Sequence, residues 1–113
     1  MSTLVLTIAA SLSAAMAIAA GAFGAHAAQG AAVEWLKTGG FYQLIHAVAI
    51  LVVMQRFPSA AWLLLIGSLI FSVSLYAMAL GAPRWFGAIT PIGGTVMIIA
   101  WLICAYNAWR SGV

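Results

Sequence analysis

Residues 4–26 read LVLTIAASLSAAMAIAAGAFGAH and contain no Asp, Glu, Lys or Arg. A helix of about 20 mostly apolar residues crosses the hydrocarbon core of a bilayer, so this stretch is long enough to span a membrane. A secretory signal peptide instead has Lys or Arg ahead of an apolar run of roughly 7–15 residues. No Lys or Arg precedes Leu4, and the apolar run is longer than that. The stretch therefore predicts a transmembrane helix that is retained.

The composition of the whole chain also indicates a membrane protein. Its 113 residues are 66% hydrophobic and 4% charged, and the mean hydropathy is +1.18. A soluble domain carries about a quarter of its residues as charged side chains, and a disordered chain is polar, so both classes are excluded. The cationic residues Lys37, Arg56, Arg84 and Arg110 are isolated from one another. Nucleic-acid binding needs a clustered basic face, which this spacing does not provide.

Three further apolar stretches follow the first. The second covers residues 41–57, with an earlier helix start near Ala31 as the alternative; Gly39-Gly40 would then mark a bend or a junction. The third covers residues 60–80 and the fourth residues 91–109. Thr90 is the expected N-cap of the fourth, with Pro91 at its first helical position.

Short links after the second and third stretches require antiparallel neighbours. The fold class expected is therefore all-α: residues 1–113 form a single transmembrane domain, an up-down-up-down four-helix bundle. Both termini then lie on one side with Arg56 and Arg110, and Lys37 and Arg84 lie on the other. Two cations against two leave the membrane orientation undecided. Aromatic residues near the expected span ends fit interfacial belts, and they are Trp35, Tyr42, Trp62, Trp85 and Trp109. Trp101 is deeper in the fourth span and is expected to pack against other helices.

A few polar residues are expected to converge at the end of the bundle opposite the termini. They are His26, Gln43, His46, Tyr76 and Thr90. Gln43 and His46 are three residues apart, so they share a helix face. Polar side chains are costly in hydrocarbon and therefore seek partners. The group is either a set of interhelical ties or, if water enters, a ligand or proton site.

Small residues provide candidate helix contacts, because transmembrane helices associate through small side chains and hydrogen bonds. The predicted packing positions are Gly21, Gly24, Ser68, Ser72, Gly93 and Gly94.

No metal site, cofactor or catalytic group is predicted. Metal sites usually need three or four ligands, and no carboxylate or second cysteine accompanies the two histidines within the spans. A Ser-His-acid hydrolase would need an acid inside the membrane, and none is present there. The single Cys104 lies in an apolar run and is expected to be an inert buried thiol. We therefore do not expect an enzyme.

Several strings resemble the domain-of-unknown-function 423 family, the YgdD/YwdK-like small membrane proteins. They are GAFGAH at 21–26, YQ at 42–43 with HA at 46–47, GS at 67–68 with FS at 71–72 and SLY at 74–76, and ITPIGG at 89–94. These strings touch all four spans in order. The sequence departs from the family at Val73, where a glycine is expected between two serines, which puts one tight helix contact in doubt. The resemblance implies a small multi-pass protein of the bacterial inner (plasma) membrane, and it implies no activity.

Two functional classes remain from the sequence. The first is a structural or interaction protein that self-associates in the lipid bilayer or supports other membrane proteins. Flat small-residue surfaces favour a homo-oligomer: Ala10, Ala14, Gly21, Gly67 and Ser74. The alternative is a small transporter or channel using a polar half-site around Gln43 and His46. Small multidrug transporters have a similar length but use an intramembrane carboxylate, which this chain lacks, so His46 alone would carry any proton coupling.

Overall fold

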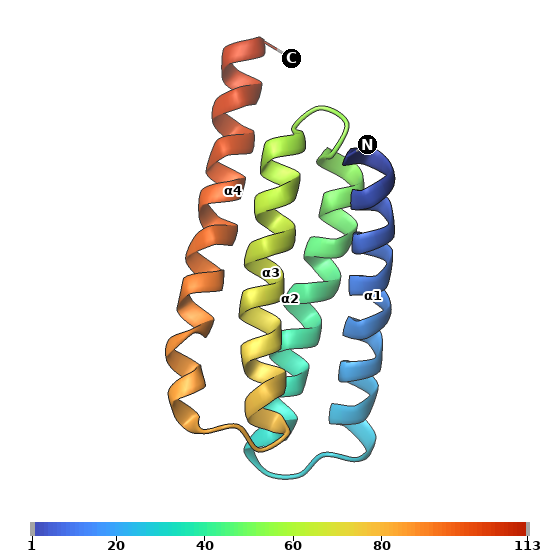
Figure 1. Ribbon diagram of the computed structural model, residues 1–113, viewed down its shortest axis with the longest axis vertical. Helices are drawn as coiled ribbons and strands as arrows, with labels where there is room; N and C mark the ends of the chain where they lie inside the picture. The colour runs from blue at the N-terminus through green and yellow to red at the C-terminus, as the bar shows by residue number, and fades with distance from the viewer. Residues whose placement is uncertain (1, 113) are drawn as a thin grey trace.

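The computed structural model describes residues 2–112 as four long helices joined by short links (Figure 1). The helices are α1 (Ser2–His26), α2 (Ala31–Val53), α3 (Pro58–Ala79) and α4 (Thr90–Ser111), and the 3-10 helix η1 (Arg84–Ala88) precedes α4. They alternate in direction, so the first and last described residues lie at the same end of the molecule. The expected all-α class and up-down-up-down order are confirmed.

All four helices are long and apolar enough to cross a membrane. The shortest, α3 and α4, have 22 residues each, which corresponds to roughly 33 Å at the helical rise and exceeds a hydrocarbon core of about 30 Å.

Helix α2 takes the earlier of the two starts expected for the second span. It begins at Ala31 rather than at 41, and it ends at Val53 rather than at 57. Gly30, with a φ of 64°, closes the preceding link, and Glu34 lies in the first turn, where the positive end of the helix dipole favours an acidic side chain. The helix continues through Gly39-Gly40 without the expected junction, because both glycines are buried against neighbouring helices.

The start of α4 differs from the sequence prediction by one residue. Thr90 is the first helical residue and Ile89 is the N-cap, so Thr90 does not cap the helix. Its hydroxyl instead pairs with the hydroxyl of Ser74 on α3. At the same end of the molecule, the Arg84 guanidinium lies 5.6 Å from the ring centroid of Trp35. This contact brings the link between α3 and α4 next to the first turns of α2.

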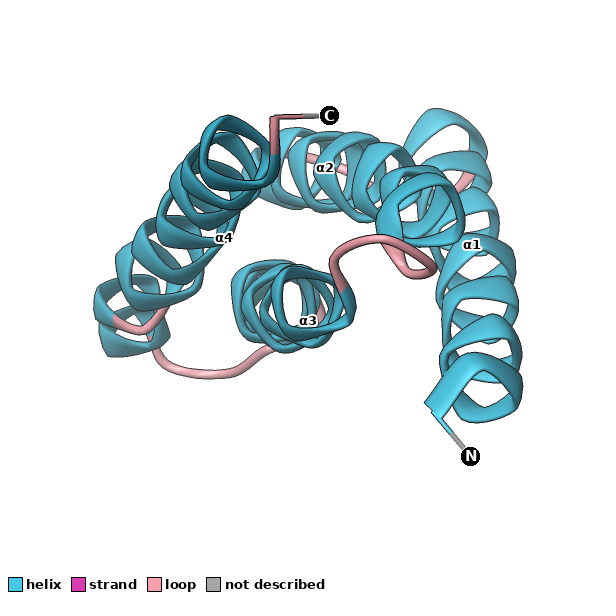
Figure 2. Cartoon of the chain, turned by 90° about the horizontal axis from the view of Figure 1, so that it is seen from above, coloured by secondary structure: helices cyan, strands magenta, loops and turns pink. Residues whose placement is uncertain are grey.

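The packing of the helices is open rather than closed. Seen from above, α3 lies inside an arc formed by α4, α2 and α1 (Figure 2). Each helix packs on the next in sequence, and α3 also contacts α1, whereas α1 and α4 do not contact each other among the described residues. Helix α3 is the most buried of the four, and α1 and α4 keep broad outer faces. The main apolar cluster comprises Leu6, Ala10, Ile50, Ala61, Leu64, Leu65 and Ala100.

Candidate functional site

A chain of buried hydrogen bonds centred on Gln43 joins three helices. The Tyr76 hydroxyl on α3 donates to Gln43 Oε1 at 2.6 Å, and Gln43 Nε2 donates to Ser13 Oγ on α1 at 3.0 Å. The Gln43 side chain is fully buried, and Ser13 and Tyr76 are nearly so. Satisfied hydrogen bonds of this kind compensate for taking polar groups out of water, so the chain can exist inside a bilayer.

The glycine pair in α2 makes room for this hydrogen-bond chain. A Cβ at Gly39 would lie 2.6 Å from Tyr76 Cε1, so only glycine lets the tyrosine ring cross α2 there. The Ser72 hydroxyl donates to the Gly39 carbonyl at 2.9 Å, which ties the same two helices together. A Cβ at Gly40 would lie 3.0 Å from the Ala17 carbonyl oxygen on α1. The pair thus serves helix approach on two sides of α2, not the bend that the sequence suggested.

His46 forms a second polar connection, between α2 and α4. Its Nε2 accepts the indole N–H of Trp101 at 3.1 Å, and its Nδ1 lies 2.8 Å from the Tyr42 carbonyl oxygen. Because an indole N–H can only donate and a carbonyl can only accept, these partners require a neutral imidazole with its proton on Nδ1. Both ring nitrogens are therefore occupied within the protein.

A groove of about 400 Å³ lies beside this histidine, between α2, α3 and α4. It is lined by Tyr42, His46, Phe71, Gly94, Met97, Ile98 and Trp101. The Tyr42 ring contacts Phe71 at 5.0 Å between centroids, so Tyr42 belongs to the middle of the bundle and not to an interfacial belt. Apart from the edge of His46 and the Tyr42 hydroxyl, the walls are apolar.

The polar residues expected to converge divide into separate places. Gln43 and Tyr76 are hydrogen-bonded; His46 belongs to the connection with Trp101, and Thr90 pairs with Ser74. His26 is exposed at the end of α1 and bonds to none of the others. The early start of α2 causes the difference. It places Gln43 and His46 in the middle of a helix rather than near its end.

The predicted packing residues hold contacts of different kinds. A Cβ at Gly93 would collide with the Phe71 backbone nitrogen, and one at Gly24 would lie 3.0 Å from Leu36 Cβ, so both mark close helix contacts. Gly94 instead faces the groove, and Ser68 donates to the carbonyl of Leu65 within its own helix. Ser72 bonds across to α2, and the backbone of Gly21 lies beside Gly40.

Sequence reasoning missed Ser13, the packing role of the Gly39-Gly40 pair, and the bond from Trp101. Ser13 could have been found from spacing: Leu6, Ala10, Ser13, Ala17 and Gly24 recur at helical intervals and form the buried face of α1. No comparable local pattern points from Trp101 to His46, which lies 55 residues earlier in the chain.

The described residues contain no group of three or more His, Cys, Asp or Glu side chains that could hold a metal ion. Cys104 is a buried free thiol. Together, the contacts around Gln43 and His46 can join helices, and the groove beside His46 can accommodate an apolar group.

Comparison with known proteins identifies related sequences. The family model described as "Protein of unknown function (DUF423)" matches residues 20–94. A UPF0382 membrane protein of Haemophilus influenzae is 39% identical over 107 residues, covering 83% of this chain and 85% of the relative. The UPF0382 inner membrane protein YgdD of Escherichia coli K12 is 40% identical, covering 85% of each chain. A UPF0382 membrane protein of Staphylococcus epidermidis is 41% identical, covering 81% of this chain and 84% of the relative. No solved structure matches this chain.

Proposed function

This chain belongs to the DUF423 family, whose relatives are named membrane proteins, and we propose that it is a non-enzymatic interaction protein that self-associates within the bilayer. The proposal rests on one observation, the outer face of α1. Ser11, Ala15, Ala19 and Ala22 are all exposed, and their spacing places them along a single stripe. His26 lies at the end of the same face.

This outer stripe resembles the inner face of the same helix. On the inner face, small residues let α2 approach so closely that a Cβ at Gly40 would meet the backbone of Ala17. The outer face offers side chains of the same size at the same spacing. Lipid tails are as apolar as leucine, so helices in a bilayer associate through close packing of such small residues. A second copy of the chain is therefore the partner we propose for this face.

The small residues named from the sequence as an oligomer surface take a different role. Ala10, Gly67 and Ser74 are buried within the bundle, and Ala14 and Gly21 are half-buried. These residues face neighbouring helices of the same chain, so they do not form a surface for a second copy. The interface that we propose therefore lies on the opposite side of α1.

Cysteine cross-linking in lipid bilayers tests the proposal. In a Cys104→Ala background, Ala15→Cys should form disulfide-linked dimers at low protein-to-lipid ratio, and the exposed α2 position Val52→Cys is the matched control. Adding Ala22→Phe should reduce the Ala15→Cys dimer, because a large ring separates the two stripes. Equal cross-linking at Ala15 and Val52, or none at Ala15, would reject self-association through α1.

The groove beside His46 supports a second candidate function, transport through the polar half-site. It gives a small molecule access to a histidine edge from between the helices. Two features weigh against it: the Gln43 side chain is fully buried, and any use of His46 Nε2 must first break its bond to Trp101. Proteoliposomes containing a pH-sensitive dye distinguish the candidates. Proton flux above that of empty vesicles that is lost in His46→Phe would favour transport.

A further inference from the structure

The groove beside His46 combines aromatic walls, an unpaired hydroxyl and a position in the middle of the membrane span. Its volume of about 400 Å³ lies within the range of roughly 300–1,000 Å³ that is usual for small-molecule sites. We propose that the groove binds a flat ring compound that carries carbonyl oxygens and is dissolved in the bilayer, the class to which quinones belong. The inference is independent of self-association, which uses the outer face of α1, and it requires no transport.

The groove exists because α2 and α4 do not pack directly on each other among the described residues. The bond from Trp101 to His46 bridges the two helices, and Phe71 of α3 lines the space between them. Gly94 on α4 keeps the groove wide, since even an added Cβ there would approach only the Phe71 ring, at 3.8 Å. The space is therefore part of the helix arrangement and does not depend on a mobile segment.

Aromatic rings line much of the groove and favour a flat ligand. The centroids of Tyr42 and Phe71 lie 5.0 Å apart in an edge-to-face contact, and those of His46 and Trp101 lie 6.0 Å apart. These contacts fix the rings in place before a ligand arrives. Because aromatic rings pack well on other flat rings in offset or edge-to-face geometry, the walls fit a planar ring better than a branched aliphatic group.

The Tyr42 hydroxyl supplies the polar group that would recognise a carbonyl. Tyr42 lines the groove, and its hydroxyl makes no hydrogen bond to any residue that the structure describes. Both ring nitrogens of His46 and the indole N–H of Trp101 are already paired, so we assign them no ligand contact. A phenol hydroxyl can donate to a carbonyl oxygen, and an unpaired hydroxyl in hydrocarbon is costly.

The depth of Tyr42 selects a compound dissolved in the hydrocarbon over a phospholipid. Tyr42 is the central residue of α2. The hydrocarbon core is about 30 Å thick, so phospholipid headgroups lie roughly 15 Å from its centre, and the core contains no water to pair with the hydroxyl. A lipid-soluble ring compound brings its carbonyl to this depth. Exposed Ile98 and Leu102 continue the apolar surface along α4, where a hydrocarbon tail on the ring can lie.

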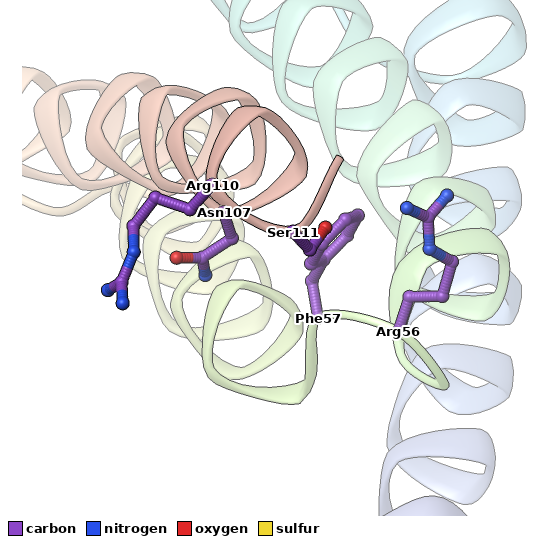
Figure 3. A pocket seen from close by; sticks show the side chains of 5 residues that line it. All are labelled: Arg56, Phe57, Asn107, Arg110 and Ser111. Carbon is purple, nitrogen blue, oxygen red and sulfur yellow. The ribbon is translucent and has the colours of Figure 1, made fainter. Parts of the chain in front are cut away.

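The pocket at the end of the bundle that holds the first and last described residues offers no comparable site. It is lined by Arg56, Phe57, Asn107, Arg110 and Ser111. In Figure 3 the side chains of Arg56 and Arg110 are directed apart, so their guanidinium groups do not converge on one ligand.

Radioligand binding to the full chain, with one copy in each nanodisc, tests the inference. The probes are tritiated duroquinone, a methylated quinone ring, and tritiated durene, the same methylated ring without the carbonyls. Tyr42→Phe keeps the aromatic wall and removes the hydroxyl. It should raise the apparent Kd of duroquinone about threefold to tenfold, the effect of one lost hydrogen bond, and leave that of durene unchanged. Tyr106→Phe is the matched control, because Tyr106 is exposed on α4 outside the groove.

A second variant tests the location of the site. Gly94→Leu places a side chain in the groove and should abolish specific binding of both compounds, and circular dichroism checks that the helices remain folded. Unchanged binding in this variant would put the ligand elsewhere and overturn the inference. Equal affinity of the wild-type protein for duroquinone and durene, or no specific binding of duroquinone, would also overturn it. So would an equal rise in the Kd of duroquinone in Tyr42→Phe and Tyr106→Phe.

Discussion

Replacing Gln43 with leucine tests whether the buried hydrogen-bond chain stabilises the bundle. The substitution removes the bond from Tyr76 at 2.6 Å and the bond to Ser13 at 3.0 Å, at a position with no exposed surface. Hydrogen bonds between transmembrane helices contribute about 0.6 kcal/mol on average and up to about 1.7 kcal/mol. Losing both bonds should therefore lower the free energy of unfolding by about 1 to 3 kcal/mol.

The tyrosine provides a second, smaller perturbation of the same chain. Tyr76→Phe removes one bond and keeps the ring that crosses Gly39, so it should cost about 0.6 to 1.7 kcal/mol. The double variant Gln43→Leu/Tyr76→Phe should be more stable than the sum of the two single losses predicts, because the bond they share is counted twice in that sum.

Reversible unfolding in mixed micelles, followed by circular dichroism as the fraction of SDS rises, measures these free energies. Gln55→Leu is the matched control, because Gln55 is exposed in the link after α2, and it should leave the stability unchanged. If Gln43→Leu unfolds at the same SDS fraction as the wild type, or if the two single losses simply add, the hydrogen-bond chain does not hold the helices together.

Three further outcomes are expected. Gly93→Ala should destabilise the protein by about 1 to 3 kcal/mol, because the added Cβ would meet the backbone of α3. Gly94→Ala should cost little, since its Cβ would meet only the Phe71 ring at 3.8 Å. Equal melting temperatures of the two variants would contradict the close contact at Gly93. In ¹⁵N solid-state NMR, the His46 signals should be those of a protonated Nδ1 and an unprotonated Nε2, and the reverse assignment would exclude the bond from α4. In a cysteine-free background, cysteines placed at Lys37 and Gln55 should react with impermeant reagents from opposite sides of the membrane, and labelling from one side would contradict the path of α2.

The start of α2 shows where sequence reasoning is limited. Hydropathy places an apolar span after residue 41 and leaves a helix start near Ala31 as the alternative. The helix does begin at Ala31, because Gly39 and Gly40 pack against α3 and α1 instead of interrupting it. Glycine is a weak helix former by its intrinsic propensity. In this chain the close approach of two neighbouring helices decides its role, and that approach cannot be read from the glycines themselves.

The hydrogen-bond partners of Gln43 and His46 could not be predicted from the sequence either. Spacing within one helix correctly places Gln43 and His46 near each other along α2, but it does not show that one bonds to α1 and α3 and the other to α4. The helices are apolar on all sides, since a lipid-facing surface and a core-facing surface use the same side chains. The pattern of apolar and polar residues identifies the buried face of a soluble helix, but in these helices it does not separate the lipid-facing side from the core-facing side.

The sequence by itself determined the class of protein, the number of membrane-crossing helices, their alternating directions and the family. The class and the number and directions of the helices follow from the length and hydropathy of contiguous stretches and from short links, which are local properties of the chain. The family follows from the resemblance of short sequence strings in all four spans. Only the tertiary structure decided that α3 is central, that α1 and α4 stay apart, and that Ser13 and Trp101 complete the polar contacts. The physical reason is that these features depend on which faces of the helices meet. Inside a bilayer that choice is made by side-chain fit and hydrogen bonding between residues far apart in sequence, because exclusion from water favours every apolar face equally.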